Sequence, residues 1–142
     1  MDFATALNVS ASGLSAERTR VDLAASNLAN AESTHGPDGQ VYRRRDPVFS
    51  TQPFDQQLGQ AFGASQAVGV RVSSVVEDSQ PGRRVYSPDH PDADEEGFIT
   101  LPNVDPVHEV VNLVSAQGAY DANATAVETL ETMATKALDI VR

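Results

Sequence analysis

The chain has 142 residues, enough for one domain. Its hydrophobic content of 40% allows a core, but only 6% of the residues are aromatic and tryptophan is absent, so the core must use small aliphatic side chains. The formal net charge is -10, and residues 46–142 hold fifteen acids against five bases. Because phosphate binding needs a positive surface, this charge argues against nucleic acid as a partner.

Several kinds of site and segment are absent from the sequence. There is no cysteine, which excludes disulfides and thiol sites. No apolar run approaches the ~20 residues of a membrane span, so the chain is not expected to be membrane-spanning. The first residues lack the basic and apolar regions of a cleaved signal peptide. Composition therefore predicts a cytoplasmic protein or one exported without cleavage.

Residues 1–31 are predicted to be an N-terminal helical unit, helical from residue 2. Large aliphatic side chains recur every seven residues, at Leu7, Leu14, Val21 and Leu28. This narrow seam is typical of coiled-coil packing and not of a broad globular face. Gly13 interrupts it and lowers helix propensity by about 1 kcal/mol relative to alanine.

The middle of the chain has a different character. Residues 32–66 have weak periodicity, so we expect a loose connector that is mobile or that orders only against partners. Within it, the spacing of Phe54, Leu58 and Phe62 predicts a short helix. Residues 67–102 are predicted to form a small β module, with strands at 68–72, 83–87 and 98–101 separated by Gly and Pro turns.

Residues 103–142 are predicted to be a second long helix. A seam steps through it by three and four residues, at Leu113, Ala116, Tyr120, Asn123, Val127, Leu130, Ala134, Ala137 and Val141. At ~1.5 Å per residue the helix would exceed ~50 Å, which favours coiled-coil or filament packing over a 15 kDa globule. The fold class is therefore α+β, with long coiled-coil-type helices flanking a small β-hairpin module.

Asn123 leaves two alternatives open. Its side chain either makes a register-setting polar contact on the seam, or the seam rotates so that Ala124 faces inward. The seam as a whole is poor in large side chains, each worth roughly 1.5–3 kcal/mol when buried. Ordering the backbone costs about 1–2 kcal/mol per residue. We therefore expect the helical ends to fray in the monomer and to become ordered in an assembly.

The acidic stretch at 92–103 imitates the start of a calcium-binding EF-hand loop. Asp92, Asp94 and Glu96 occupy ligand positions, but Asn103 stands where a bidentate Glu is required. Prolines also occur where an EF-hand requires its flanking helices. An acidic loop that leads into a strand is therefore the favoured interpretation.

No other pattern indicates chemistry. The three histidines have no metal-ligand spacing, and no nucleophile elbow or phosphate-binding loop occurs. We therefore expect no enzyme activity, no catalytic or metal site and no cofactor. Arg43, Arg44 and Arg45 form the one basic run. In so acidic a chain, this run favours a charge contact with an acidic face of a neighbouring subunit, with a solvated loop as the alternative.

Three stretches resemble bacterial flagellar rod and hook proteins. The first is the motif Asn27, Leu28, Ala29, Asn30 and Ala31, which is similar to the N-terminal signature of that family. Residues 109–124 resemble its C-terminal signature. Between them, residues 86–104 are similar to a stretch typical of a proximal-rod member. The three together, in this order and at this length, are highly specific and span nearly the whole chain.

The resemblance implies a structural subunit of the flagellar basal-body rod that supports motility. Such a subunit would pass through the flagellar export apparatus without a cleaved signal peptide. It would assemble in the periplasm around the export channel, with its terminal helices packing against other rod proteins and copies of itself. One alternative is a calcium-binding or adaptor module. The other, within the family, is another rod or hook subunit, although the middle module is too small for the hook and distal-rod members.

Overall fold

The structure, a computed structural model, describes residues 3–36, 39–53 and 68–140. Its elements in chain order are α1 (Phe3–Ala29), β1 (Arg45–Pro53), β2 (Val68–Glu77), β3 (Arg83–Tyr86), β4 (Phe98–Leu101) and α3 (Pro106–Ile140). The predicted α+β class with long terminal helices is confirmed. The predicted helix at Phe54, Leu58 and Phe62 lies outside the described residues.

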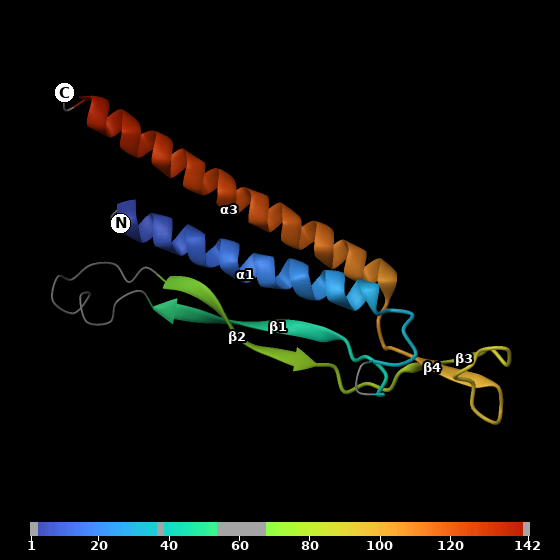
Figure 1. The fold of residues 1–142 in the computed structure, drawn as a ribbon. Helices are drawn as coiled ribbons and strands as arrows, with labels where there is room; N and C mark the ends of the chain where they lie inside the picture. The colour runs from blue at the N-terminus through green and yellow to red at the C-terminus, as the bar shows by residue number, and fades with distance from the viewer. Residues whose placement is uncertain (1–2, 37–38, 54–67, 141–142) are drawn as a thin grey trace.

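The two helices lie side by side and run in opposite directions, and the β1–β2 ribbon covers the other side of α1 (Figure 1). α1 is therefore the middle of three layers. The start of α1 and the end of α3 lie at one end of the molecule, and the β3–β4 hairpin projects from the opposite end. The result is an elongated shape with little interior.

The long helix α3 starts with a strong local signal. Asp105 caps it, because its Oδ1 accepts a hydrogen bond from the Val107 N–H at 3.0 Å. Pro106 occupies the first helical position, where its fixed φ suits the helix and its missing N–H costs nothing. The helix then continues through Gly118 to Ile140 without a break.

Strand β1 lies within residues 32–66, so the prediction of a connector without regular structure was wrong for this part. β1 pairs antiparallel with β2, from Arg45 opposite Glu77 to Pro53 opposite Val68. Two prolines in β1 hide its strand pattern in the sequence. A two-stranded ribbon consists only of edge strands, where a missing N–H can face away from the partner.

The predicted single module at 67–102 is divided between two sheets. β2 pairs with β1, whereas β3 and β4 form a separate antiparallel hairpin, with Arg83 opposite Leu101. The hairpin supplies much of the small core through Ile99 and Leu101, which are buried together with Val104. The three predicted strands are present, but β2 continues beyond residue 72 to Glu77. The partner of β2 is β1, which the sequence pattern did not indicate.

The ribbon approaches α1 closely at one point. The Ser12 Oγ accepts a hydrogen bond from the Val70 N–H at 3.1 Å and donates one to the Val9 carbonyl at 2.7 Å. A side chain at Gly69 would place its Cβ 2.8 Å from the same Oγ. Glycine at this position therefore allows the strand to lie against the helix.

Candidate assembly site

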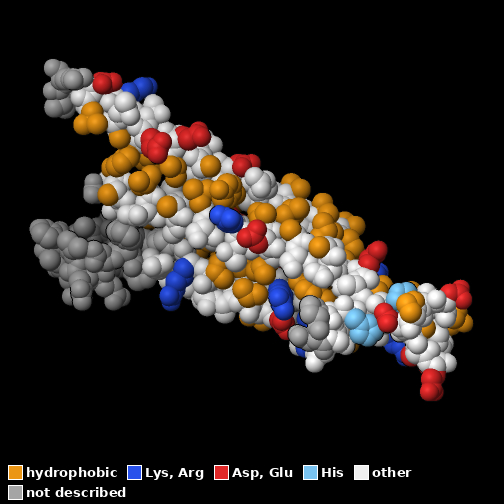
Figure 2. Space-filling view, in the orientation of Figure 1, with side chains coloured by type: hydrophobic (Ala, Val, Ile, Leu, Met, Phe, Trp, Pro, Cys, Tyr) orange, Lys and Arg blue, Asp and Glu red, His pale blue; other side chains and the backbone are white. Residues whose placement is uncertain are grey.

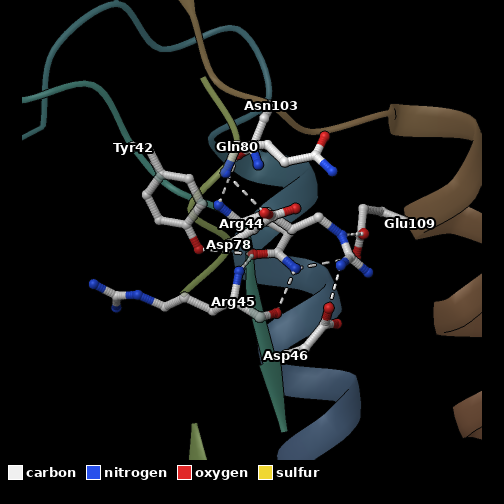
Figure 3. A network of polar contacts seen from close by, with 9 residues as sticks. Tyr42, Arg44, Arg45, Asp46, Asp78, Gln80, Asn103 and Glu109 are labelled. Carbon is white, nitrogen blue, oxygen red and sulfur yellow. Dashed lines mark hydrogen bonds and ion pairs between the residues drawn. The ribbon is translucent and has the colours of Figure 1, made fainter. Parts of the chain in front are cut away.

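A buried polar cluster joins the end of α1, the start of β1 and the first turn of α3 (Figure 3). Glu109 and Asn27 are its most buried members, each 1% exposed. The Glu109 carboxylate accepts hydrogen bonds from the Arg44 Nε at 2.6 Å and the Asn27 Nδ2 at 3.1 Å. A buried carboxylate is costly unless it is paired in this way.

Asn27 uses both ends of its amide in the cluster. Its Nδ2 also donates to the Arg45 carbonyl at 2.9 Å. Its Oδ1 accepts hydrogen bonds from the Tyr42 hydroxyl and from the Arg45 N–H, each at 2.9 Å. One side chain of α1 therefore binds the backbone at the start of β1, the Tyr42 hydroxyl and a carboxylate of α3.

Arg44 carries the positive charge of the cluster. Burial acts to lower its pKa, but the hydrogen bond and charge of Glu109 and the charge of Asp46 outweigh burial and raise the pKa. The Arg44 N–H donates to the Asn103 Oδ1 at 3.2 Å. Within the described residues, the buried Asn103 Nδ2 has no hydrogen-bond partner. The charges of Arg44 and Glu109 are thus neutralised within the chain. The cluster fixes the position of the helices relative to each other.

The predicted seam residues lie partly, and not fully, inside the monomer. Leu7, Leu14, Val21 and Leu28 on α1 are half-buried, as are Leu113, Tyr120, Val127 and Leu130 on α3. Val141 lies outside the described residues. The fully buried positions of α1, which lies between α3 and the ribbon, are instead Gly13, Ala16, Ala24 and Asn27. Whether the half-buried set forms an assembly seam stays a prediction.

The helices meet closely where Gly13 faces Asn123. A Cβ at Gly13 would lie 3.0 Å from the Asn123 amide, so the glycine that interrupts the seam permits the contact. Asn123 faces α1, and its Nδ2 donates to the Ala119 carbonyl of its own helix at 3.0 Å. Asn123 therefore lies on the seam, but its hydrogen bond is made within its own helix and not across to α1.

The basic run is used largely within the chain. Arg44 pairs with Glu109 and Asp46, and Arg45 pairs with Glu77 at 3.0 Å and lies over the Tyr42 ring. Arg43 is exposed and makes no ion pair with any described residue. The predicted contact between subunits therefore depends mainly on Arg43.

The acidic loop before β4 is stabilised by hydrogen bonds to its own carboxylates. Asp94 accepts from the Phe98 N–H at 2.8 Å, from the Glu96 N–H at 3.0 Å and from Arg84 at 2.7 Å, and these bonds outweigh desolvation and lower its pKa. Asp92 accepts from the Thr34 hydroxyl at 2.6 Å, which lowers its pKa. Among the described residues, no three acidic or histidine side chains are grouped to hold a metal ion.

The sequence patterns did not reveal the apolar side chains left exposed on α3. Val107, Val111 and Val114 are 73%, 62% and 67% exposed, and Met133, Leu138 and Ile140 are also exposed. Figure 2 shows hydrophobic side chains along the α3 edge of the molecule. The spacing of the three valines by four and then three residues marks this face in the sequence, but the predicted seam lies on the opposite side of the helix.

Two known protein families match this chain. Residues 7–37 match the family described as "Flagella basal body rod protein", and residues 95–140 match "Flagellar basal body rod FlgEFG protein C-terminal". These ranges cover most of α1 and all of β4 and α3.

Relatives named "Flagellar basal-body rod protein FlgC" align over almost the full length. The one from Salmonella typhimurium is 44% identical, covering 94% of this chain and 93% of its own. Those from Bacillus subtilis and Borreliella burgdorferi are 41% and 35% identical, covering 94% and 100% of this chain and 95% and 99% of their own. The chain belongs to the FlgC family. It is a structural subunit of the flagellar basal-body rod.

The helix junction gives the motif at residues 27–31 a physical role. Asn27 forms the polar cluster, Asn30 donates its amide to the Ser26 carbonyl at 2.8 Å at the end of α1, and Ala31 is buried. Leu28 is half-buried and Ala29 is exposed.

No helix of the described ranges is long and apolar enough to cross a membrane.

Proposed function

We propose that this FlgC-family chain assembles into the rod through its two terminal helices, around the export channel and in the periplasm. Residues 1–31 and 103–142 carry the packing, and the partners are copies of the chain and other rod proteins. The chain reaches this site through the flagellar export apparatus without a cleaved signal peptide. Its role in motility is mechanical, and it is not an enzyme.

The observation that carries this proposal is the exposure of Val107, Val111 and Val114 on a helix that is already packed against α1 on its other side. Burying three such side chains is worth roughly 5 kcal/mol gross. Exposed apolar side chains that follow one helical face are typical of an interaction surface. An assembly of parallel subunits would bury them.

The overhang of α3 supports the same proposal. Gly13 lies against Asn123 and Asn27 bonds Glu109, so this antiparallel register places the start of α1, at Phe3, opposite about residue 133. α3 continues to Ile140, and the exposed Leu138 and Ile140 lie beyond the end of its partner helix. We still expect this end to fray in the dilute monomer and to order against neighbours.

Charge supplies a second contact in this proposal. The exposed Arg43 pairs with an acidic face of a neighbouring subunit, such as the acidic half of α3 or the loop that holds Asp92 and Asp94. Such a pair at a surface contributes about 0–1 kcal/mol. Its main effect is therefore on orientation, and the apolar faces supply most of the free energy.

The test is complementation of a host strain that lacks its own copy of the gene. The double variant Val111→Glu, Val114→Glu should fold as a monomer, because surface changes usually alter stability by less than about 0.5 kcal/mol. It should nevertheless give at least tenfold fewer hooks and abolish swimming. Hook-basal bodies are counted by electron microscopy, and monomer folding is checked by circular dichroism.

The matched control is Ser74→Glu, Thr100→Glu, which makes the same charge change at exposed positions on β2 and β4. We expect this control to retain most hooks. Normal hook numbers with the α3 variant, at equal protein levels, would contradict assembly through the helices. Hookless cells with both variants would show only a general sensitivity to charge and would equally count against the helix-specific proposal.

A further inference from the structure

A hollow of about 450 Å³ lies where the chain enters β1 and leaves β2. Its walls are the stretch 40–43, before β1, and the turn 79–82, after β2. Asn103, between β4 and α3 in the chain, completes the lining. Of the described residues that line it, none belongs to α1 or α3, so the hollow is separate from the packing surfaces of the two helices.

One buried donor at this hollow has no partner among the described residues. The Asn103 Oδ1 accepts a hydrogen bond from the Arg44 N–H at 3.2 Å, and this bond fixes the direction of the amide. The Asn103 Nδ2 is then the atom that is buried and unsatisfied. Figure 3 shows this amide beside Gln80, which lines the same hollow. Because a buried donor without an acceptor is unfavourable, an acceptor that enters the hollow would be stabilised there.

Arg43 carries the only charge among the described residues that line the hollow. It is exposed and makes no ion pair with a described residue, whereas Arg44 and Arg45 pair with carboxylates of their own chain. The two acids at the end of β2 are already engaged. Glu77 pairs with Arg45 at 3.0 Å, and the Asp78 Oδ1 accepts a hydrogen bond from the backbone of the turn at 2.9 Å. The hollow therefore offers an uncompensated positive charge.

The backbone of the stretch 41–43 is also available for binding. The stretch has no regular secondary structure, and its N–H and C=O groups bond no other described backbone group. Regular pairing begins only with the Arg44 carbonyl, which accepts from the Asp78 N–H at 2.8 Å. Unpaired backbone groups can bind those of a peptide, and a cation beside an amide donor suits a carboxylate. Together these features select a peptide that carries negative charge.

We propose that this hollow binds a carboxylate carried by an acidic peptide segment, with Arg43 as its counter-charge and the Asn103 Nδ2 as a donor to the same segment. This inference rests on the proposed charge contact of Arg43, and it names the site and the chemical group that the site binds. The chain itself carries such a segment in the loop before β4. There Glu95 is exposed and makes no ion pair with a described residue. A second copy or another acidic protein can supply the segment, and rising protein concentration distinguishes these sources.

The test adds a capped hexapeptide with the sequence of residues 92–97 to the full-length chain and follows the two-dimensional ¹H–¹⁵N NMR spectrum. The peptide should shift the side-chain NH₂ signals of Asn103 and the backbone signal of Arg43 to saturation. Arg43→Gln should weaken binding about fivefold, as expected for the loss of one ion pair at a surface. The matched variant is Arg18→Gln, at an exposed arginine of α1 that makes no ion pair with a described residue. It should weaken binding less than about twofold.

A hexapeptide with every acid replaced by its amide is the control ligand and should give no saturable shift. Equal shifts with this neutral peptide, or with inorganic phosphate at the same concentration, would overturn the proposal. Binding of the acidic peptide that leaves the Asn103 NH₂ signals unmoved would also overturn it, because attraction to a surface charge alone does not involve the buried donor. None of these results depends on the packing of α3, which the complementation test measures separately.

A dilution series without peptide identifies the source of the carboxylate. Movement of the Asn103 NH₂ signals toward their peptide-bound positions as protein concentration rises would assign the segment to a second copy. Signals that stay in place over the series, while the peptide still binds, would assign it to another acidic protein. Both results support the site, whereas the absence of any peptide binding would overturn it.

Discussion

Replacing Glu109 by alanine is expected to destabilise the monomer by about 3 kcal/mol. Removing one partner of a buried ion pair usually costs about 3–5 kcal/mol, because the other charge is left buried. The lower value applies here because Arg44 keeps Asp46 as a partner. The Asn27 amide also loses an acceptor. The free energy of unfolding is measured by urea denaturation of the full chain.

Two comparisons make this result specific. Glu131→Ala, an exposed acid on the same helix, should change the free energy of unfolding by less than about 0.5 kcal/mol. Replacing Glu109 by Leu and Arg44 by Met together should restore part of the loss, since a buried ion pair exchanged for apolar side chains is often neutral. Equal stability of Glu109→Ala and Glu131→Ala would refute the role of the cluster.

Replacing Asn27 by alanine is expected to cost about 2–4 kcal/mol. The substitution removes four hydrogen bonds, to the Arg45 backbone, Tyr42 and Glu109, at a position that is 1% exposed. Each buried group left unsatisfied costs about 1–3 kcal/mol, and relaxation or water entry recovers part of the sum. Thermal and urea unfolding followed by circular dichroism measure the loss.

The second asparagine of the same motif provides the control. The side chain of Asn30 makes one hydrogen bond to a described residue, to the Ser26 carbonyl, at a partly buried position, so Asn30→Ala should cost about 1 kcal/mol or less. A double-mutant cycle between Asn27 and Glu109 should give a coupling of at least about 0.5 kcal/mol, because the two side chains are in contact. If Asn30→Ala were the more damaging change, the cluster would not be the main link at the junction.

The long helices were predictable because their signals are local. Spacing by three and four residues, together with Asp105 and Pro106 at the start of α3, determines a helix over its whole length. The positions of β2, β3 and β4 followed from alternation and from turn residues. The strand β1 did not, because Pro47 and Pro53 are read as breaks unless the chain is known to form an edge.

The polar cluster around Asn27 and Glu109 was less predictable, because it depends on contacts between distant parts of the chain. The Asn27 motif was recognised by resemblance, but its link to Glu109, over 82 positions of sequence, is a property of the antiparallel register. Likewise, the run of arginines was read as a contact between subunits, whereas Arg44 neutralises a carboxylate of its own chain. Sequence spacing indicates faces of helices, but it does not tell which charges meet.

The central claim is that the helices of this rod subunit are covered by neighbours in the assembled rod. It is tested most directly by labelling the single variant Val111→Cys with a maleimide, in the purified monomer and in isolated hook-basal bodies. The position is 62% exposed in the monomer, so we predict fast labelling there and labelling at least tenfold slower in the rod. Equal labelling rates in monomer and rod would contradict the account.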